Sequence, residues 1–186
     1  MGMSQNDKVV LVDESGCDLH NDDGTLSTLD KIEAHRQGSL HRAVSVFIFN
    51  YNNELLLQKR ADEKYHSAGK WSNTCCTHPF PGQTPIFAAR RRLIEEMGIL
   101  TALEEQFTFK YKAEVGNSLI EHEFDHVFTG AFSKDPVPNA AEVSGWKWMD
   151  LDKLGLEMVK NPEIYTPWLR LVFRDLVNRS LRFART

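Results

Sequence analysis

The chain has 186 residues, of which 41% are hydrophobic and 26% carry a charge. These proportions are typical of globular proteins and exclude a largely disordered chain, and the length fits one compact domain better than two. The formal net charge of −4 disfavours a nucleic-acid partner, although a local cluster of basic side chains could still bind a small anion.

The sequence shows no sign of a membrane or secretory segment. The longest apolar run, residues 43–49, is far shorter than the ~20 residues that span a bilayer, and residues 1–30 lack a basic segment followed by an apolar one. Three cysteines, an odd number, fit a reducing compartment better than a disulfide framework. We therefore expect a cytoplasmic protein with no membrane partner; its oligomeric state stays open, with a monomer favoured.

Two β-rich regions begin the chain. Residues 9–16 predict a strand with a turn, and the polar run 17–25 predicts a loop. Residues 43–60 hold two β-rich runs on either side of Asn50-Tyr-Asn-Asn, which has the composition of a turn. This pattern predicts a β-hairpin.

Residues 84–98 predict a helix. Thr84 is a candidate N-cap, Pro85 suits the first helical position and Gly98 can end the helix. Its apolar residues keep helical spacing and are expected on one face: Ile86, Phe87, Leu93, Ile94 and Met97. Arg92 and Glu96 are expected as an i,i+4 pair on another face.

The second half of the chain predicts a further hairpin, a strand and a helix. The runs 107–115 and 119–132 are joined by Gly116-Asn117-Ser118, and residues 146–151 form a shorter strand. Thr166-Pro167 opens a helix over residues 168–181. We expect one α/β domain in which mixed strands pack with a few helices.

Histidine and glutamate spacing suggests a metal site. Of seven histidines, His78 is held in a rigid turn before Pro79. Glu121 and Glu123 lie two residues apart on an expected strand, so their carboxylates share a face that His122 does not. Two adjacent carboxylates repel unless a cation lies between them or one is protonated. A solvated acidic strand edge is the alternative.

The tandem cysteines Cys75 and Cys76 lie in WSNTCCTHP, residues 71–79. Neighbouring Cα atoms are ~3.8 Å apart, too close for an ordinary disulfide, whose Cα atoms are ~4.4–6.8 Å apart. In a strand-like segment the two side chains face opposite ways, so only one can enter a site. The other is then expected to pack as a small buried hydrophobe.

Four motifs, taken together and in order, resemble the type I isopentenyl-diphosphate isomerases of the Nudix-like superfamily. They are EAHRQGSLHRAV, WSNTCCTHP, LIEHEF and TPWL. The resemblance runs from about residue 8 to about residue 175 and implies a Nudix-like mixed sheet packed between helices. Residues 1–186 would then be a single Nudix-like domain with a short N-terminal extension and a C-terminal tail.

The resemblance implies that one divalent ion, manganese, magnesium or zinc, is surrounded by His35, His41, His78, Glu121 and Glu123. Three imidazoles with two carboxylates suit Mn²⁺ or Zn²⁺ better than Ca²⁺ or Mg²⁺, which prefer oxygen ligands. The spacing from His35 to His41 is one residue shorter than in bacterial members. The resemblance therefore fixes the position of His35 less firmly than that of the other ligands.

The implied reaction interconverts isopentenyl and dimethylallyl diphosphate, in isoprenoid biosynthesis, through a tertiary carbocation. Cys76 and Glu123 would flank the substrate as proton donor and acceptor, in an order that stays open. Cys75, at a position where bacterial members tolerate an apolar residue, would be the buried one of the two cysteines. Tyr111 and Trp168 match the family's active-site aromatics, and an indole face can stabilise the cation by about 2 kcal/mol. The alternative for Trp168 is an ordinary core residue of its helix.

The resemblance also implies a diphosphate subsite. It assigns Arg60, Lys64 and Arg92 to the diphosphate, and Glu96 to a Mg²⁺ ion that arrives with the substrate. A structural Arg92–Glu96 salt bridge, worth ~0.3–0.5 kcal/mol on an exposed helix, is the competing interpretation.

Hydrolysis is the rival activity, because RRLIEEMGI resembles the end of a Nudix box. Arg91-Arg92 stands where hydrolases have Arg-Glu, and Thr77 and Gln83 occupy the leading Gly and Glu positions. The missing carboxylates would remove ligands for the metal cluster that activates water. A non-catalytic metal-binding module on the same fold is a third interpretation.

Overall fold

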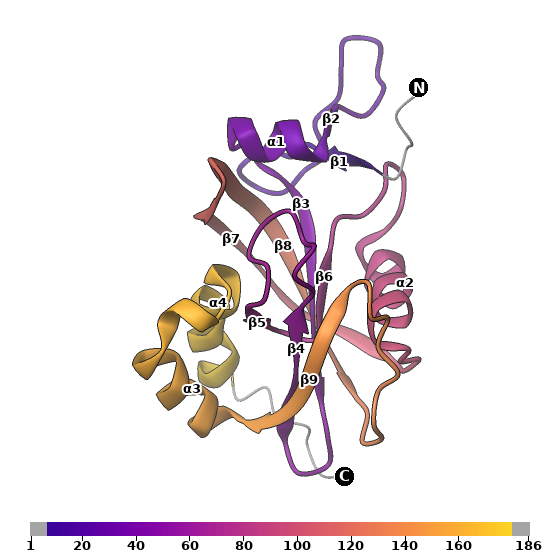
Figure 1. The fold of residues 1–186 in the computed structure, drawn as a ribbon. Helices are drawn as coiled ribbons and strands as arrows, with labels where there is room; N and C mark the ends of the chain where they lie inside the picture. The colour runs from indigo at the N-terminus through magenta and orange to yellow at the C-terminus, as the bar shows by residue number, and fades with distance from the viewer. Residues whose placement is uncertain (1–6, 180–186) are drawn as a thin grey trace.

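The computed structural model describes residues 7–179. A mixed seven-stranded sheet lies between helix α2 on one face and helices α3 and α4 on the other (Figure 1). The helices span Pro85–Met97 (α2), Leu151–Lys160 (α3) and Pro167–Asn178 (α4). This arrangement confirms the expected α/β fold, a Nudix-like mixed sheet packed between helices.

The two predicted hairpins lie next to each other in the sheet. β3 (His41–Phe49) pairs antiparallel with β4 (Glu54–Arg60), and β7 (Leu103–Gly116) pairs antiparallel with β8 (Leu119–Ala131). β3 and β8 run parallel to each other, which joins the hairpins and makes the sheet mixed. The remaining strands are β5 (Trp71–Ser72) and β9 (Val143–Asp150), both on β4, and β6 (Cys75–Thr77) on β3.

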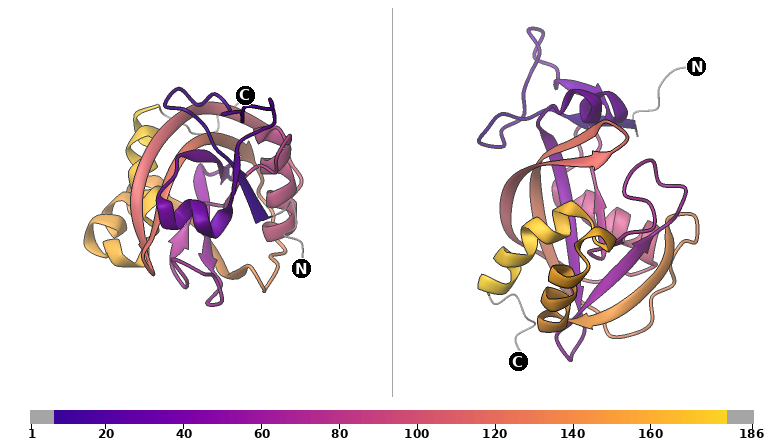
Figure 2. Two further views of the ribbon diagram at one scale, coloured as in Figure 1. Left: turned by 90° about the horizontal axis from the view of Figure 1, so that it is seen from above. Right: turned by 60° about the vertical axis from the view of Figure 1, so that its left-hand side comes forward.

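The N-terminal segment covers one end of the sheet (Figures 1 and 2). β1 (Lys8–Val10) and β2 (Thr28–Asp30) pair with each other, and helix α1 (Lys31–Gln37) follows directly. Asp30 starts α1 by accepting hydrogen bonds from the backbone N–H groups of Ile32 and Glu33. α1, which the sequence had not predicted, carries His35.

Strand β3 separates two hydrophobic cores. Val44, Val46 and Ile48 pack on the α2 side, whereas Phe47 and Phe49 pack on the side of α3 and α4. Alternation along a strand sends successive side chains to opposite faces, so a continuous apolar run supplies both cores. β3 is therefore the central strand on which the site is built.

Helix α2 begins and ends as predicted, but its buried face differs. Phe87 and Ile94 are 62% and 47% exposed. The helix instead buries Ala88, Ala89, Leu93, Glu96 and Met97. Its small residues face the sheet, and the residues expected on one apolar face do not share one. Glu96 consequently lies on the buried side, contrary to expectation.

The C-terminal elements were only partly predicted. The strand at 146–151 begins earlier, at Val143, and Leu151 already belongs to α3, a helix that the sequence had not predicted. α4 opens at Pro167 as expected, while its expected end at residue 181 lies outside the described residues. Across residues 7–179, each helix is too short or too polar to traverse a bilayer.

Candidate active site and metal centre

A cavity of about 370 Å³ lies against the sheet, with charged and aromatic side chains around it. Cys76 and Glu123 both line it, as do Tyr111, Trp168 and His78. The cavity is also lined by Arg60, Lys64 and Arg92, the residues expected to bind the diphosphate. The proton-transfer residues and the diphosphate residues therefore share one cavity.

Strand register explains why these residues meet. On β3, His41 stands opposite Glu123 of β8, and Ser45 stands opposite Cys76 of β6. On β7, Tyr111 stands opposite the same Glu123. Paired residues of neighbouring strands direct their side chains to the same face of the sheet. These pairings therefore bring the side chains of His41, Tyr111 and Glu123 together.

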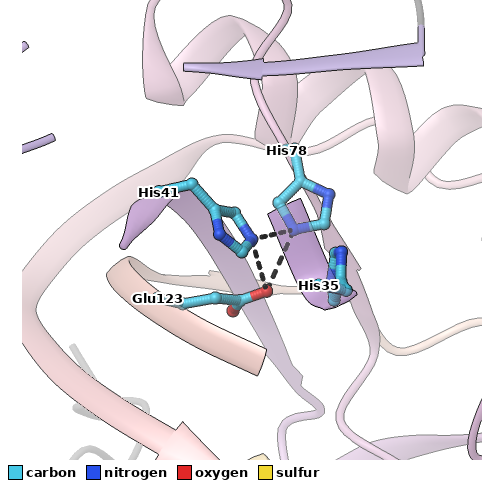
Figure 3. Close-up of side chains that lie close together, drawn as sticks. All are labelled: His35, His41, His78 and Glu123. Atoms are coloured by element: carbon cyan, nitrogen blue, oxygen red, sulfur yellow. Dashed lines mark hydrogen bonds and ion pairs between the residues drawn. The ribbon is translucent and has the colours of Figure 1, made fainter. Parts of the chain in front are cut away.

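Four side chains converge closely enough to hold one ion: His35, His41, His78 and Glu123 (Figure 3). The His78 Nε2 atom lies 2.9 Å from Glu123 Oε1 and 3.2 Å from His41 Nε2. The His41 Nε2 atom lies 3.7 Å from the same Glu123 oxygen. The structure thus brings together four of the five expected ligands, including His35 despite its shortened spacing.

Backbone contacts prepare two of the imidazoles for metal binding. His35 donates its Nδ1–H to the Lys31 carbonyl oxygen at 2.5 Å, and His41 donates its Nδ1–H to the Ser39 carbonyl oxygen at 2.8 Å. Both rings then offer a bare Nε2 lone pair, the form that binds metals. The His35 Nε2 atom is buried with no hydrogen-bond partner. A cation in this position would satisfy it, so the residues fit a divalent ion.

Glu121, the fifth expected ligand, lies beside this group rather than in it. Its Oε1 atom is 3.2 Å from His66 Nε2, and its Oε2 atom accepts a hydrogen bond from the Tyr111 hydroxyl at 2.8 Å. The same hydroxyl lies 2.7 Å from Glu123 Oε2. His66 was missed by the sequence analysis, because nothing in its spacing separates it from the other histidines.

The carboxylates of Glu121 and Glu123 have opposite protonation tendencies. Burial, and then the neighbouring Glu123, raises the pKa of Glu121 well above its ordinary value. Burial also acts on Glu123, but its contacts with His41 and His78 outweigh it and hold the pKa well below the ordinary value. The Tyr111 hydroxyl has one hydrogen, so it can donate to only one of the two carboxylates at a time.

The Cys76 thiol is held from two sides. Its Sγ atom lies 3.1 Å from Asn73 Oδ1 and 3.5 Å from Ser45 Oγ, and Ser45 in turn donates to Asp125 at 2.6 Å. Burial, followed by Asp125, raises the pKa of Cys76, so the sulfur keeps its proton. Cys75 points the other way into the core packed on α2, as predicted.

Trp168 is both a core residue of its helix and a residue that lines the cavity. It is 3% exposed and packs in a small cluster with Tyr111, and it also lines the cavity. Its Nε1–H donates to Asn73 Oδ1 at 3.1 Å, the oxygen that also faces Cys76. The indole is therefore fixed in orientation beside the thiol.

The expected diphosphate cations Arg60, Lys64 and Arg92 all line the cavity. Arg92 lies 2.7 Å from both Glu96 and Glu142, and Lys64 contacts the same two carboxylates. The Arg92–Glu96 pair is therefore not the exposed helix pair that the sequence allowed, because Glu96 is buried and also receives Gln58 Nε2 at 2.6 Å. The sequence analysis missed three residues of this region: Glu142, Gln58 and Lys31. Glu142 and Lys31 also line the cavity.

Comparison with known proteins agrees with this architecture. A family model of the NUDIX domain matches residues 39–172. Among solved structures, DR0079 from Deinococcus radiodurans superposes with a TM-score of 0.69 at 18% identity, covering 94% of this chain and 99% of that one. A MutT protein from Methanosarcina mazei gives 0.62 at 21% identity, covering 77% and 96%. The fold and the matched domain define a NUDIX-domain protein.

Curated relatives narrow the family further. Isopentenyl-diphosphate Delta-isomerase 1 of Aromatoleum aromaticum is 53% identical over 163 residues, covering 88% of each chain. The isopentenyl-diphosphate Delta-isomerase of Pectobacterium atrosepticum is 48% identical and covers 89% of each. The chain therefore belongs to the isopentenyl-diphosphate Delta-isomerase family.

Proposed function

We propose that this protein interconverts isopentenyl diphosphate and dimethylallyl diphosphate and so serves isoprenoid biosynthesis. Relatives at 45–53% identity carry the name of this activity. The observation that carries the proposal is that Cys76 and Glu123 line one cavity together with the cations Arg60, Lys64 and Arg92. A diphosphate bound by the cations would leave its short hydrocarbon chain between the two proton-transfer groups.

In this proposal Cys76 and Glu123 add and remove the two protons of the reaction. A group that donates in one direction of a reversible reaction accepts in the other, so both serve in both roles. Trp168 offers its ring face to the carbocation. Tyr111, which hydrogen bonds to Glu123 Oε2, holds that carboxylate in position.

The proposed metal ligands are His35, His41, His78, Glu121 and Glu123. Nitrogen and carboxylate donors together suit Mn²⁺ or Zn²⁺, and Mg²⁺ is the third candidate. A bound divalent ion supplies positive charge beside Glu123 and so favours its carboxylate form. The two imidazoles that donate to backbone carbonyls keep their Nε2 atoms directed to the centre.

For the diphosphate we propose an exchange of ion pairs. Without substrate, Lys64 and Arg92 are neutralised by Glu96 and Glu142. The oxygens of a bound diphosphate would pair with these two cations, and the freed carboxylate of Glu96 would be available to hold the Mg²⁺ ion that accompanies the substrate. Arg60, whose guanidinium carbon lies 5.3 Å from the centre of the Trp168 ring, adds a third positive charge to the cavity.

Hydrolysis is disfavoured by the position of the carboxylates on α2. Within residues 7–179, neither of the two His/Glu groups that could hold a metal includes Glu95, which leaves Glu96 as the one α2 carboxylate proposed for a metal ion. Glu95 is exposed and contacts Arg91 and Arg92 instead. Gln83, at a position where hydrolases have a glutamate, accepts a hydrogen bond from the backbone of Phe80.

A proton NMR assay in D₂O with Mg²⁺ and isopentenyl diphosphate tests the function. We expect dimethylallyl diphosphate containing deuterium, without release of phosphate. Cys76→Ala and Glu123→Gln should each lower kcat by about 10²–10⁴-fold, since each removes a general acid or base. Cys75→Ala, which changes the opposite face, is the matched control and should retain activity. Free phosphate as the main product would favour the hydrolase.

The cellular setting belongs to the same proposal. We infer a cytoplasmic protein that acts as a monomer on a small-molecule substrate. Light scattering after size-exclusion chromatography tests the second point, because a monomer should give a mass close to 21.3 kDa. A stable mass of twice this value would replace the monomer with a dimer.

A further inference from the structure

His66 is a buried side chain that the proposed reaction does not use. It lies in the loop between β4 and β5, is 4% exposed, and has its ring 4.3 Å from Tyr65 and 5.8 Å from both His35 and Trp168, measured between centroids. Arg60 donates a hydrogen bond to its carbonyl oxygen at 3.0 Å, which fixes the loop from the cavity side. The imidazole is thus held rigidly beside the metal centre.

The hydrogen-bond pattern of His66 differs from that of the ligand histidines. His35 and His41 each place their Nδ1–H on a backbone carbonyl, leaving Nε2 bare for an ion. His66 Nδ1 is buried and has no partner, while its Nε2 lies 3.2 Å from Glu121 Oε1. A proton on Nδ1 would be an orphaned buried donor facing no acceptor, whereas a proton on Nε2 is satisfied by Glu121.

We propose that His66 is a positioning residue of the metal centre, which holds the carboxylate of Glu121 by donating its Nε2–H to Oε1. With Tyr111 on Oε2, both oxygens of Glu121 have a fixed partner. The carboxylate is therefore kept next to the group of His35, His41, His78 and Glu123 before any ion arrives. A pre-oriented ligand loses less conformational entropy on binding.

The size of the effect follows from the general behaviour of groups that orient metal ligands. Removing such a partner typically weakens metal binding by about 10–100-fold. The inference rests on the proposed metal centre, but not on isomerase turnover, because its direct consequence is affinity for the ion. His35, His66 and Glu121 also lie close enough together to hold an ion. The inference gives the two histidines different roles: His35 is a ligand, and His66 orients one.

The test compares His66→Phe and His66→Gln in the full chain. Binding of Zn²⁺ is measured by competition with a chromophoric chelator, and the visible absorption of the Co²⁺-loaded protein reports the ligand set. We expect His66→Phe to bind Zn²⁺ about 10–100-fold more weakly. His66→Gln, whose amide N–H can replace Nε2–H, should bind close to wild type and keep the wild-type Co²⁺ spectrum.

His126→Gln is the matched control. Like His66, His126 pairs with a glutamate, with its Nδ1 2.7 Å from Glu105 Oε1, but it lies on β8 and does not line the cavity. The His126→Gln substitution should leave the Zn²⁺ affinity unchanged. Unchanged affinity in His66→Phe would overturn the inference. Equal losses in both His66 variants with an altered Co²⁺ spectrum would overturn it too, because they would make His66 itself a ligand.

Failure of the underlying proposals would be recognised separately. If wild type binds no Zn²⁺, the metal centre is wrong, and with it the role of His66. If wild type binds Zn²⁺ and the variants behave as expected while the D₂O assay shows no isomerisation, the function is wrong and the role of His66 stands.

Discussion

At the scale of single residues, the Cys76 thiol combines access to the cavity with a suppressed tendency to ionise. Its sulfur lines the cavity and faces Asn73 and Ser45. Burial raises its pKa, and the nearby Asp125 adds to this effect. A thiol that stays protonated can act in proton transfer, but it is a weak nucleophile, because alkylating reagents react with the thiolate.

The first prediction concerns alkylation of Cys76 in the chelated, ion-free protein. Because the raised pKa keeps the thiolate fraction small, the rate with iodoacetamide should rise about tenfold per pH unit from pH 7 to 9 with no plateau. Mass spectrometry of a Cys17→Ala variant follows the reaction, since Cys17 is exposed and would react as well. A rate that levels off below pH 9 would contradict the raised pKa.

The second prediction concerns Glu142, whose carboxylate lies on the same two cations that we assign to the diphosphate. Without Mg²⁺, Glu142→Gln should bind inorganic pyrophosphate about fivefold more tightly, because one competing ion-pair partner worth about 1 kcal/mol is removed. Isothermal titration calorimetry measures this. Glu104→Gln, at an exposed position of β7, is the control with the same loss of charge. Weaker binding by Glu142→Gln would mean that Glu142 holds the cations in place instead.

The residues predicted from sequence and those that were missed differ in a physical way. Cys76, His78 and Glu123 stand in short motifs that resemble those of the isomerase family, and their expected roles came from that resemblance. His66 and Glu142 gain their roles only from contacts with Glu121 and Arg92, which are distant in sequence. Spacing along one chain segment carries no information about such contacts.

At the scale of elements, the end of α2 determines where Glu142 lies. Gly98 ends the helix with φ of +65° and donates its N–H to the Ile94 carbonyl oxygen. The following chain returns to this point, where Val137 donates to the Met97 carbonyl oxygen and Asn139 to that of Glu96. The helix end thereby anchors the loop that leads to Glu142.

The third prediction is that Gly98→Ala destabilises the protein more than an open glycine does. A Cβ at Gly98 would lie 2.6 Å from the Val137 carbonyl oxygen, in addition to the strain of a positive φ. Gly24 has φ of +80° and nothing within 4 Å of its Cβ position, so Gly24→Ala isolates the conformational cost. We expect a loss of about 1–2 kcal/mol for Gly24→Ala and at least about 1 kcal/mol more for Gly98→Ala in urea unfolding. Equal losses would mean that the loop yields without cost.

Helices and strands were predictable where the residue propensities of a segment agreed with turn or cap residues at its ends. The two hairpins have clear turns, and α2 has Pro85 and Gly98 at its ends. α1 and α3 were missed although Asp30 and Asp150 are recognisable N-caps. The apolar face of α2 was wrong because Phe87 and Ile94 are hydrophobic but exposed, and hydrophobicity alone does not place a residue inside.

At the scale of the whole molecule, the proposed ion joins elements that are far apart in the sequence. His35 lies on α1, His41 on β3, His78 just after β6 and Glu123 on β8. β1, β2 and α1 form a separate small unit that covers one end of the main sheet (Figure 2). An ion bound by these residues would add a further link between that unit and the sheet, so binding and folding should be coupled.

The fourth prediction is that a divalent ion stabilises the folded chain. At an ion concentration of 100 Kd, Zn²⁺ or Mn²⁺ should raise the free energy of unfolding by about 2.7 kcal/mol, and excess chelator should remove the gain. His35→Ala should abolish most of the ion-dependent gain, because it removes the one ligand that α1 supplies. His20→Ala, at an exposed histidine in the N-terminal loop, should keep it. Urea unfolding with and without the ion measures all three proteins, and a gain of equal size in His35→Ala would show that the ion binds without α1.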